Sequence, residues 1–304
     1  MYPDVNSEKS LTMQYSSQNP GSPLFKMLLS MVIFGTIGIF RRSIPLPSEV
    51  LAFARGILGG LFLLLILKGK RQAFSWRLIR KKSFALLVLS GAMIGFNWIL
   101  LFEAYKYTTV AVATLCYYMQ PVIVLLFARP LLHEKITRRQ YLCVGLALIG
   151  MVLVSGILQG DGSASGNGAG ILLGLGAAVL YAGVVLLNKT LTRVPAYEKT
   201  TIQLFSAAIA LIPYMGWQGS LRSFNLSPSS IVLLLIVGVV HTGIAYVLYF
   251  GALEALPART AALLSYIDPV TAVLLSAVWL HEPLSISGII GAILIIGSAI
   301  YSES

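Results

Sequence analysis

The stretch LCYYMQPVIVLLFARPLLHE, residues 115–134, decides the fold, because it returns in altered form as LLSYIDPVTAVLLSAVWLHE at residues 263–282. A shift of 148 positions superposes the two stretches without a gap. Each is a nearly uncharged apolar run with Tyr-x-x-Pro near its start and His-Glu at its end. Long apolar runs are typical of membrane-spanning helices, and their repetition indicates a chain built from two similar halves.

The likeness between the halves extends upstream of these stretches. The same shift aligns residues 102–104 (Phe-Glu-Ala) with residues 250–252 (Phe-Gly-Ala), and a shift of 147 aligns Phe34 with Tyr181. Each half contains an odd number of apolar segments, so the second half begins on the opposite side of the membrane from the first. We therefore predict an all-α integral membrane protein with ten transmembrane helices, arranged as two inverted five-helix repeats.

Ten apolar segments underlie this prediction, since a membrane helix needs about 20 apolar residues. The predicted spans of the first half are 26–40, 48–67, 83–106, 108–132 and 139–157, and those of the second half are 168–188, 196–216, 229–251, 258–280 and 285–302. The predicted domains are a disordered cytoplasmic tail at 1–25, a first repeat at 26–157, a Gly/Ser-rich linker at 158–170 and a second repeat at 171–302.

The composition supports the same class of protein. Hydrophobic residues make up 57% of the chain and charged residues 11%, whereas a soluble domain carries about 25% charged residues. The net charge of +11 comes from basic residues in short connectors, so it reports membrane orientation and no nucleic-acid partner is expected. Cys116 and Cys143 lie in apolar runs and offer neither a disulfide framework nor zinc spacing, so we expect no metal or cofactor.

The basic residues concentrate in alternate connectors. Seven lie between Lys68 and Lys82, and four lie between Arg129 and Arg139, two connectors further along the chain. Connectors of the opposite side contain few. Because Lys and Arg favour the cytoplasmic side of a membrane, we predict a multi-pass protein of a bacterial-type cytoplasmic (inner) membrane, with both termini in the cytoplasm.

Taken together, these motifs resemble the drug/metabolite transporter superfamily, in its ten-helix branch with two EamA-type domains. The resemblance rests on residues 102–134 and their copy at 250–282, with Arg55 in the second span also matching, and it covers about residues 26–302. Members of that family are similar in moving small metabolites or drugs across membranes, often outward. The resemblance implies a secondary transporter that works by alternating access as its two halves rock, with a substrate site near the midplane.

Ionisable side chains at membrane depth cost about 2.5–3.5 kcal/mol on insertion scales, so they are candidates for function. Asp268, directly before Pro269, could bind an amine or a proton, or could pair structurally with a polar neighbour. Glu103 and His241 are further proton-coupling candidates, although Glu103 could reach the interface and His241 could be a buried neutral histidine. Arg55 could pair with a substrate carboxylate or with the carbonyl end of a helix.

Aromatic residues recur on the helices that would line the site, and an aromatic cavity with few polar groups suits a small molecule. Tyr118 and Tyr266 lie in the middle of their spans, so an interfacial belt does not explain them. Gln120 stands where the second half has Asp268, so the halves differ chemically. The predicted substrate-binding residues are Arg55, Asn97, Trp98, Tyr117, Tyr118, Gln120, Tyr181, Tyr246, Tyr266 and Asp268.

Two prolines and a glycine pair shape the predicted helices. Pro121 and Pro269 lie inside predicted spans, where a proline removes a backbone donor and kinks the helix. Gly56 and Gly60 form a Gly-x-x-x-Gly motif, which is typical of close packing between membrane helices.

These features distinguish between several classes of function. We favour a secondary transporter of small metabolites, first of amino acids or their derivatives and as an exporter, because Arg55 with Asp268 suits a zwitterion. Efflux of cationic or amphipathic drugs is the alternative. A membrane enzyme is disfavoured because the chain has no D-D-x-x-D, H-E-x-x-H or G-x-S-x-G motif, and a receptor because the connectors are short. The expected partners are a solute, the lipid bilayer and, if transport is coupled, a proton; a monomer could function.

Overall fold

The computed structural model describes residues 21–44, 46–69, 81–107, 113, 116–133, 135–154, 168–191, 194–220, 227–279 and 286–303. Within these residues the chain forms helices and no strand, so the all-α prediction is confirmed. Most of the predicted tail and linker, together with Glu134, His281 and Glu282, lies outside the described residues.

Ten helical units correspond to the ten predicted spans. The first half contains α2 (Pro23–Arg42), α3 (Ser48–Gly69), α4 (Lys81–Tyr107), α6 (Gln120–Leu132) and α7 (Arg138–Val154). The second half contains α8 (Gly168–Thr190), α9 (Ala196–Gln218), the continuous run α10 (Pro228–Ile236), η2 (Val237–Ile244) and α11 (Ala245–Ala255), the pair α12 (Ala258–Leu264) and α13 (Ile267–Trp279), and α14 (Ile286–Glu303).

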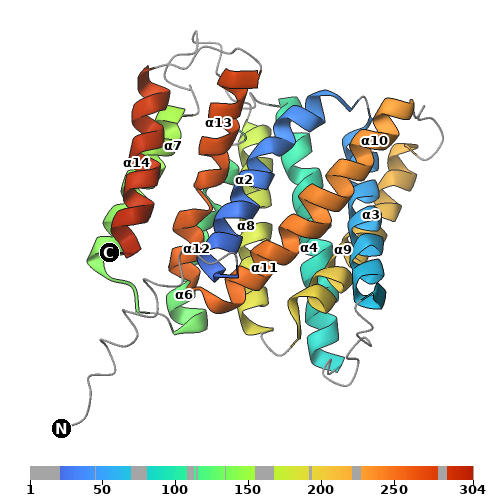
Figure 1. Cartoon of the computed structure of the whole chain (residues 1–304), viewed down its shortest axis with the longest axis horizontal. Coiled ribbons are helices and arrows are strands. Elements are labelled where there is room, and N and C mark those ends of the chain that lie inside the picture. Colours follow the sequence, from blue (N-terminus) through green and yellow to red (C-terminus); the bar gives the residue numbers. More distant parts are fainter. Residues whose placement is uncertain are drawn as a thin grey trace.

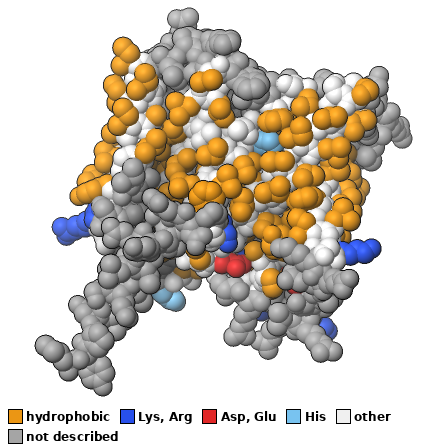
Figure 2. Space-filling view, viewed as in Figure 1, with side chains coloured by type: hydrophobic (Ala, Val, Ile, Leu, Met, Phe, Trp, Pro, Cys, Tyr) orange, Lys and Arg blue, Asp and Glu red, His pale blue; other side chains and the backbone are white. Residues whose placement is uncertain are grey.

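Four of these units are long and apolar enough to cross a membrane, and three shorter apolar helices accompany them among the described residues. The four are Ser48–Gly69, Lys81–Ala104, Gly168–Thr190 and Pro228–Ala255, and the shorter ones are Pro23–Ile37, Gln120–Leu132 and Ile286–Ser298. Apolar side chains cover much of the face of the molecule that Figure 2 shows. The exposed large apolar side chains of the described residues include Leu65, Leu172, Val278 and Ile293. A continuous apolar surface of this kind suits contact with lipid.

Both predicted kink prolines lie in the first turn of a helix. The chain turns at Tyr118 and Met119, and α6 begins at Gln120 with Pro121 next to it. The fourth span is therefore broken, as is the ninth, where α12 ends before a turn and α13 begins shortly before Pro269. A proline in a first turn removes no intrahelical hydrogen bond, so it suits a new helix start better than a kink.

Large contacts between two helices have counterparts between the equivalent helices of the other half. The contact of α4 with α8 is matched by that of α11 with α2, and the contact of α4 with α9 by that of η2 with α3. The contact of α6 with α8 is matched by that of α13 with α2. The remaining large contacts join corresponding helices, α3 with α9 and α7 with α14. Helix α6 lies at the lower end of Figure 1 and α13 at the upper end. This pairing supports the predicted inverted repeat.

Close packing around α3 follows from its glycines. A Cβ on Gly56 would lie 2.9 Å from the Leu204 carbonyl oxygen of α9, and one on Gly59 would lie 3.1 Å from the Gly238 carbonyl oxygen of η2. Gly60 faces the Phe205 ring at 3.0 Å. The predicted close packing at Gly56 and Gly60 is confirmed, and it brings Arg55 against the two helices of the other half.

Candidate functional site

Arg55 of α3 is a buried cation with only 5% of its surface exposed. Its Nε donates a hydrogen bond to Thr242 Oγ1 of η2 at 3.1 Å, and its guanidinium carbon lies 4.7 Å from the centre of the Trp98 ring of α4. Among the described residues no carboxylate forms an ion pair with it. The hydroxyl and the ring position the guanidinium without neutralising it, and a buried cation is stabilised by an anion.

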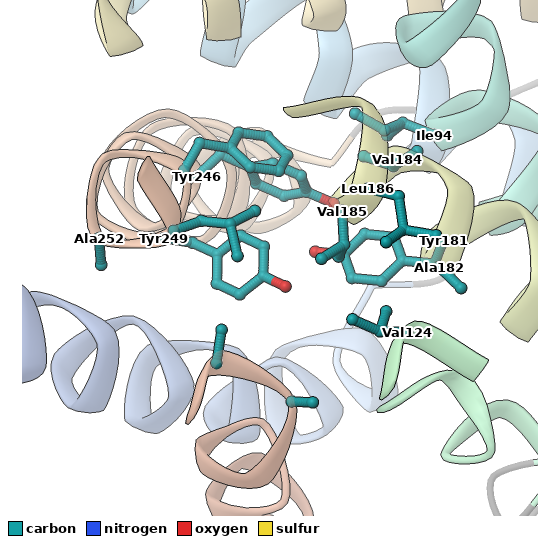
Figure 3. Packing of buried hydrophobic residues seen from close by; sticks show 14 of the residues in the cluster. Ile94, Val124, Tyr181, Ala182, Val184, Val185, Leu186, Tyr246, Tyr249 and Ala252 are labelled. Atoms are coloured by element: carbon teal, nitrogen blue, oxygen red, sulfur yellow. The ribbon is translucent and has the colours of Figure 1, made fainter. Parts of the chain in front are cut away.

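A group of aromatic rings packs together beside this cation, with Trp98 in contact with it. We call it the aromatic cluster; its members are Phe34, Trp98, Tyr117, Tyr181, Tyr246, Tyr249 and Phe250. The Trp98 and Tyr246 rings lie 6.2 Å apart, and the Tyr181 and Tyr249 rings are stacked at the same distance. Tyr181 from α8 and Tyr249 from α11 point toward each other in Figure 3. Aromatic faces and hydroxyls thus come from both halves of the chain.

Asp268 lies in the first turn of α13 and is half-buried. Its carboxylate accepts a hydrogen bond from the Tyr118 side chain. Tyr181 interacts electrostatically with Asp268 and with Arg55, so the two charged groups lie near the same tyrosine. The structure therefore brings Arg55, Asp268 and the predicted aromatic residues Trp98, Tyr117, Tyr181 and Tyr246 into one neighbourhood.

His241 lies beside this neighbourhood on η2 and is 2% exposed. Its Nε2 is 2.7 Å from Thr36 Oγ1 of α2, and its ring packs edge-on against Phe40 at 4.7 Å. Arg55 is its charged neighbour among the described residues. The helix that presents His241 and Thr242 is a π-helix, a form that is rare and frequent at functional sites.

Other predicted site residues take part in helix contacts. The Asn97 Nδ2 donates to the Ala177 carbonyl of α8 at 2.7 Å, which ties α4 to α8. The Tyr266 hydroxyl donates to the Tyr118 carbonyl at 3.3 Å, between residues that the repeat makes equivalent. Tyr118 and Tyr266 pack in a separate apolar cluster with side chains of α7 and α14.

Two further predicted residues lie on α6 and α4. Gln120 is buried at the start of α6, and Glu103 is half-buried near the end of α4. No group of three His, Cys, Asp or Glu side chains that could hold a metal ion occurs in the described part of the chain.

The profile of the EamA-like transporter family matches the chain twice, over residues 21–156 and over residues 168–302. The chain belongs to the EamA-like transporter family. The expected resemblance is thereby confirmed, and membership of a transporter family points to a membrane transport protein rather than an enzyme.

Relatives of this EamA-like transporter occur in several bacteria. The uncharacterized transporter YxxF of Bacillus subtilis is 30% identical over 266 residues, which cover 87% of this chain and 84% of that protein. The uncharacterized transporter YwfM of the same organism is 27% identical over 91% of this chain and 93% of its own length. Protein PecM of Dickeya dadantii is 27% identical over 66% of this chain and 67% of its own length.

A solved crystal structure shares the fold of this EamA-like transporter. It superposes with a TM-score of 0.82 at 20% identity, covering 94% of this chain and 99% of that one. At this identity the likeness extends to the helical architecture alone.

Several residues of the site in this EamA-like transporter were not predicted from the sequence: Thr36, Thr242 and three members of the aromatic cluster, Phe34, Tyr249 and Phe250. Thr36 and Thr242 supply the hydroxyls that hold His241 and Arg55, and Tyr249 completes the aromatic cluster. Threonines are common in membrane helices, so neither hydroxyl gave a signal. Tyr249 could have been found, because it lies three residues after Tyr246 on the same strip of α11.

Proposed function

We propose that this chain carries small zwitterionic metabolites, amino acids or their derivatives, outward across the bacterial cytoplasmic membrane. The observation that supports the proposal is Arg55, a buried guanidinium held by Thr242 and Trp98 without a carboxylate partner among the described residues. Guanidinium groups bind carboxylates through paired, charge-assisted hydrogen bonds. A substrate carboxylate would neutralise this cation.

Other groups of the site would bind the ammonium group and the apolar part of the zwitterion. Asp268, oriented by Tyr118, is available to a substrate ammonium group, and Tyr181 lies within reach of both charged residues. The aromatic cluster would receive the apolar part of the solute, since ligand sites combine apolar walls with a few placed polar groups.

Alternating access is proposed in a form different from the rocking of two sequence halves. The largest helix contacts, α7 with α14, α4 with α8 and α9, and α3 with α9, all join one half to the other. Moving one complete half against the other would break all of these contacts at once. The moving groups of helices in the proposed cycle therefore each contain segments from both repeats.

Uptake into proteoliposomes would test the proposed function. The purified chain is reconstituted and offered labelled amino acids or a cationic dye, with and without a pH gradient, and wild type is compared with Arg55→Gln and Asp268→Asn. We expect saturable amino-acid flux that falls at least tenfold in both variants. Arg129→Gln, which changes an exposed arginine of α6, is the matched control and should transport like wild type.

A second candidate, efflux of cationic amphipathic compounds, is favoured by the aromatic cluster and the Asp268 carboxylate. Arg55 opposes it, because a second cation close to a buried guanidinium would be repelled. Dye flux without amino-acid flux would select this alternative. Amino-acid flux that survives both substitutions would remove Arg55 and Asp268 from the site.

A further inference from the structure

The π-helix η2 contains one residue more than the matching stretch of the first half. Gly91 and Gly95 of α4 enclose three residues, whereas Gly238 and Gly243 of η2 enclose four. Gly91 and Gly238 therefore correspond at a shift of 147, and Gly95 and Gly243 at 148. The extra residue lies in the segment that contains His241 and Thr242, and the first half has no histidine or threonine in its place.

Hydrogen bonds around His241 define which ring nitrogen holds its proton. The Thr36 hydroxyl donates to the Ile33 carbonyl at 2.7 Å, and a hydroxyl has one proton to give. With that proton given to Ile33, the ring donates the 2.7 Å contact between Thr36 Oγ1 and His241 Nε2, and this arrangement favours the tautomer with its proton on Nε2. Nε2 is protonated in the neutral histidine, so Nδ1 has a lone pair and no described hydrogen-bond partner.

A second proton on His241 would have a hydrogen-bond acceptor. A proton on Nδ1 could be donated to the Ile236 carbonyl, which lies one π-helical turn back in the chain. The charge that opposes this second proton is Arg55 of α3, whose Nε donates a hydrogen bond to Thr242, the residue after His241 in the chain. The other described groups in contact with the ring, Thr36 and Phe40 from α2, are uncharged, and neither α10 nor the rest of η2 contains a charged residue.

We infer that His241 is a proton-binding site whose occupancy is linked to that of the carboxylate subsite at Arg55. Burial is the main obstacle to a proton on Nδ1, and the Arg55 charge adds a repulsion that a bound carboxylate would neutralise, so carboxylate and proton favour each other's binding. The proton comes from water and forms an N–H bond at Nδ1, while the ligand stays ionised. The linkage rests on the proposed function for its carboxylate subsite.

The sign of this linkage separates His241 from Asp268. A proton on Asp268 would compete with a substrate ammonium group for the same carboxylate, whereas a proton on His241 assists the binding of a substrate carboxylate. The two proton acceptors would thus respond to opposite ends of one zwitterion.

Nitrogen-15 NMR of labelled histidine tests the inference in the purified full-length protein in detergent micelles. The chain has three histidines, and His241→Gln assigns the signal of interest. The signal reports tautomer and charge directly. 3-Phenylpropionate, a carboxylate without an amine, is the probe, and 2-phenylethylamine, an amine without a carboxylate, is its control. Tryptophan fluorescence measures the binding of each independently.

Three results are expected. Ligand-free wild type at pH 7 shows neutral His241 protonated on Nε2. At every lower pH, Arg55→Gln has more protonated His241 than wild type, and Arg55→Lys, which keeps the charge, has less than Arg55→Gln. Saturating 3-phenylpropionate raises the ratio of protonated to neutral His241 in wild type by about fivefold or more, the lower bound of usual coupling between sites. It has no such effect in Arg55→Gln, and 2-phenylethylamine has none in either protein.

The outcomes distinguish this inference from the proposed function. Saturable binding of 3-phenylpropionate with an unchanged His241 signal overturns the linkage and leaves the carboxylate subsite standing. Absence of binding overturns the carboxylate subsite and the linkage together. A charged or Nδ1-protonated His241 in the ligand-free wild type overturns the inference alone, and that measurement needs neither ligand nor variant.

Discussion

Lys199 of α9 has no exposed side-chain surface, and its ammonium group pairs with Glu254 of α11, whose side chain is 25% exposed. At the same helix end, Lys189 of α8 donates to the Leu253 carbonyl at 2.9 Å and to the Leu256 carbonyl. Cations near a helix C-terminus satisfy its free carbonyls and its dipole. Two lysines from neighbouring helices therefore secure the end of α11.

Glu254→Gln should destabilise the fold, because it leaves the Lys199 charge buried without its anion. Removing one partner of a buried pair costs about 3–5 kcal/mol, and the partial exposure of Glu254 should lower this to about 2–3 kcal/mol. The free energy of unfolding in mixed micelles measures the effect. Lys199→Met combined with Glu254→Leu removes both charges and should lie closer to wild type; equal losses in the two proteins would contradict the argument.

Single functional residues could be predicted where a charged or polar side chain interrupts an apolar run, but their interaction partners could not. Arg55 and Asp268 stand out as charges in apolar runs, and the structure places both near the aromatic cluster. The partner of Arg55, Thr242, lies 187 positions away, and only the packing of α3 on η2 brings the two together. Asn97 also stood out as polar, yet its amide contacts the Ala177 carbonyl of a neighbouring helix.

Whole helices were predicted more closely than the interruptions within them. Each apolar run became a helix because membrane backbone must satisfy its own hydrogen bonds. The turns at Tyr118 and Ser265 interrupt continuous apolar runs, so hydropathy does not reveal them. The change of repeat shift from 147 to 148 indicates that the second half contains one additional residue. Only the structure shows that this residue lies in the π-helix η2, between Gly238 and Gly243.

Gly35→Ala should disturb the contact between α2 and α13. The added Cβ would lie 2.6 Å from Thr271 Cβ and 2.7 Å from the Asp268 carbonyl oxygen, too close for any relaxed side chain. Overpacking of this kind costs about 1–3 kcal/mol, and here it also displaces the turn that presents Asp268. Thermal unfolding and the uptake assay should both show the defect.

Gly145→Ala is the control for that substitution. No atom lies within 4 Å of a Cβ built on Gly145 of α7 beyond its own helix, so the alanine should be neutral or should stabilise by up to about 1 kcal/mol. If the two substitutions behave alike, the α2–α13 contact is not the close approach described above.

The molecule as a whole is interleaved, since its largest helix contacts join the first repeat to the second. The two matched family segments, 21–156 and 168–302, are therefore units of sequence rather than bodies with cores of their own. Trp98, Tyr181 and Tyr249 illustrate this, because the aromatic cluster combines side chains from α4, α8 and α11.

A chain divided between residues 160 and 161 tests this interleaving. Either fragment expressed alone should be degraded or aggregated, because it lacks the helices that cover its packing faces. Expressed together, the fragments should assemble, and an affinity tag on one should recover the other in equal amount after extraction in mild detergent. A stable, monodisperse first fragment on its own would show that each repeat folds independently.

The additional residue of η2 has an energetic consequence for a transport cycle. If transport exchanges the shapes of the two repeats, then an inward-facing state and an outward-facing state of identical repeats would have equal energies. A helix turn that holds four residues between its glycines cannot copy one that holds three. In such a cycle the two end states would differ in energy even without solute, and the empty carrier would rest with one particular side open.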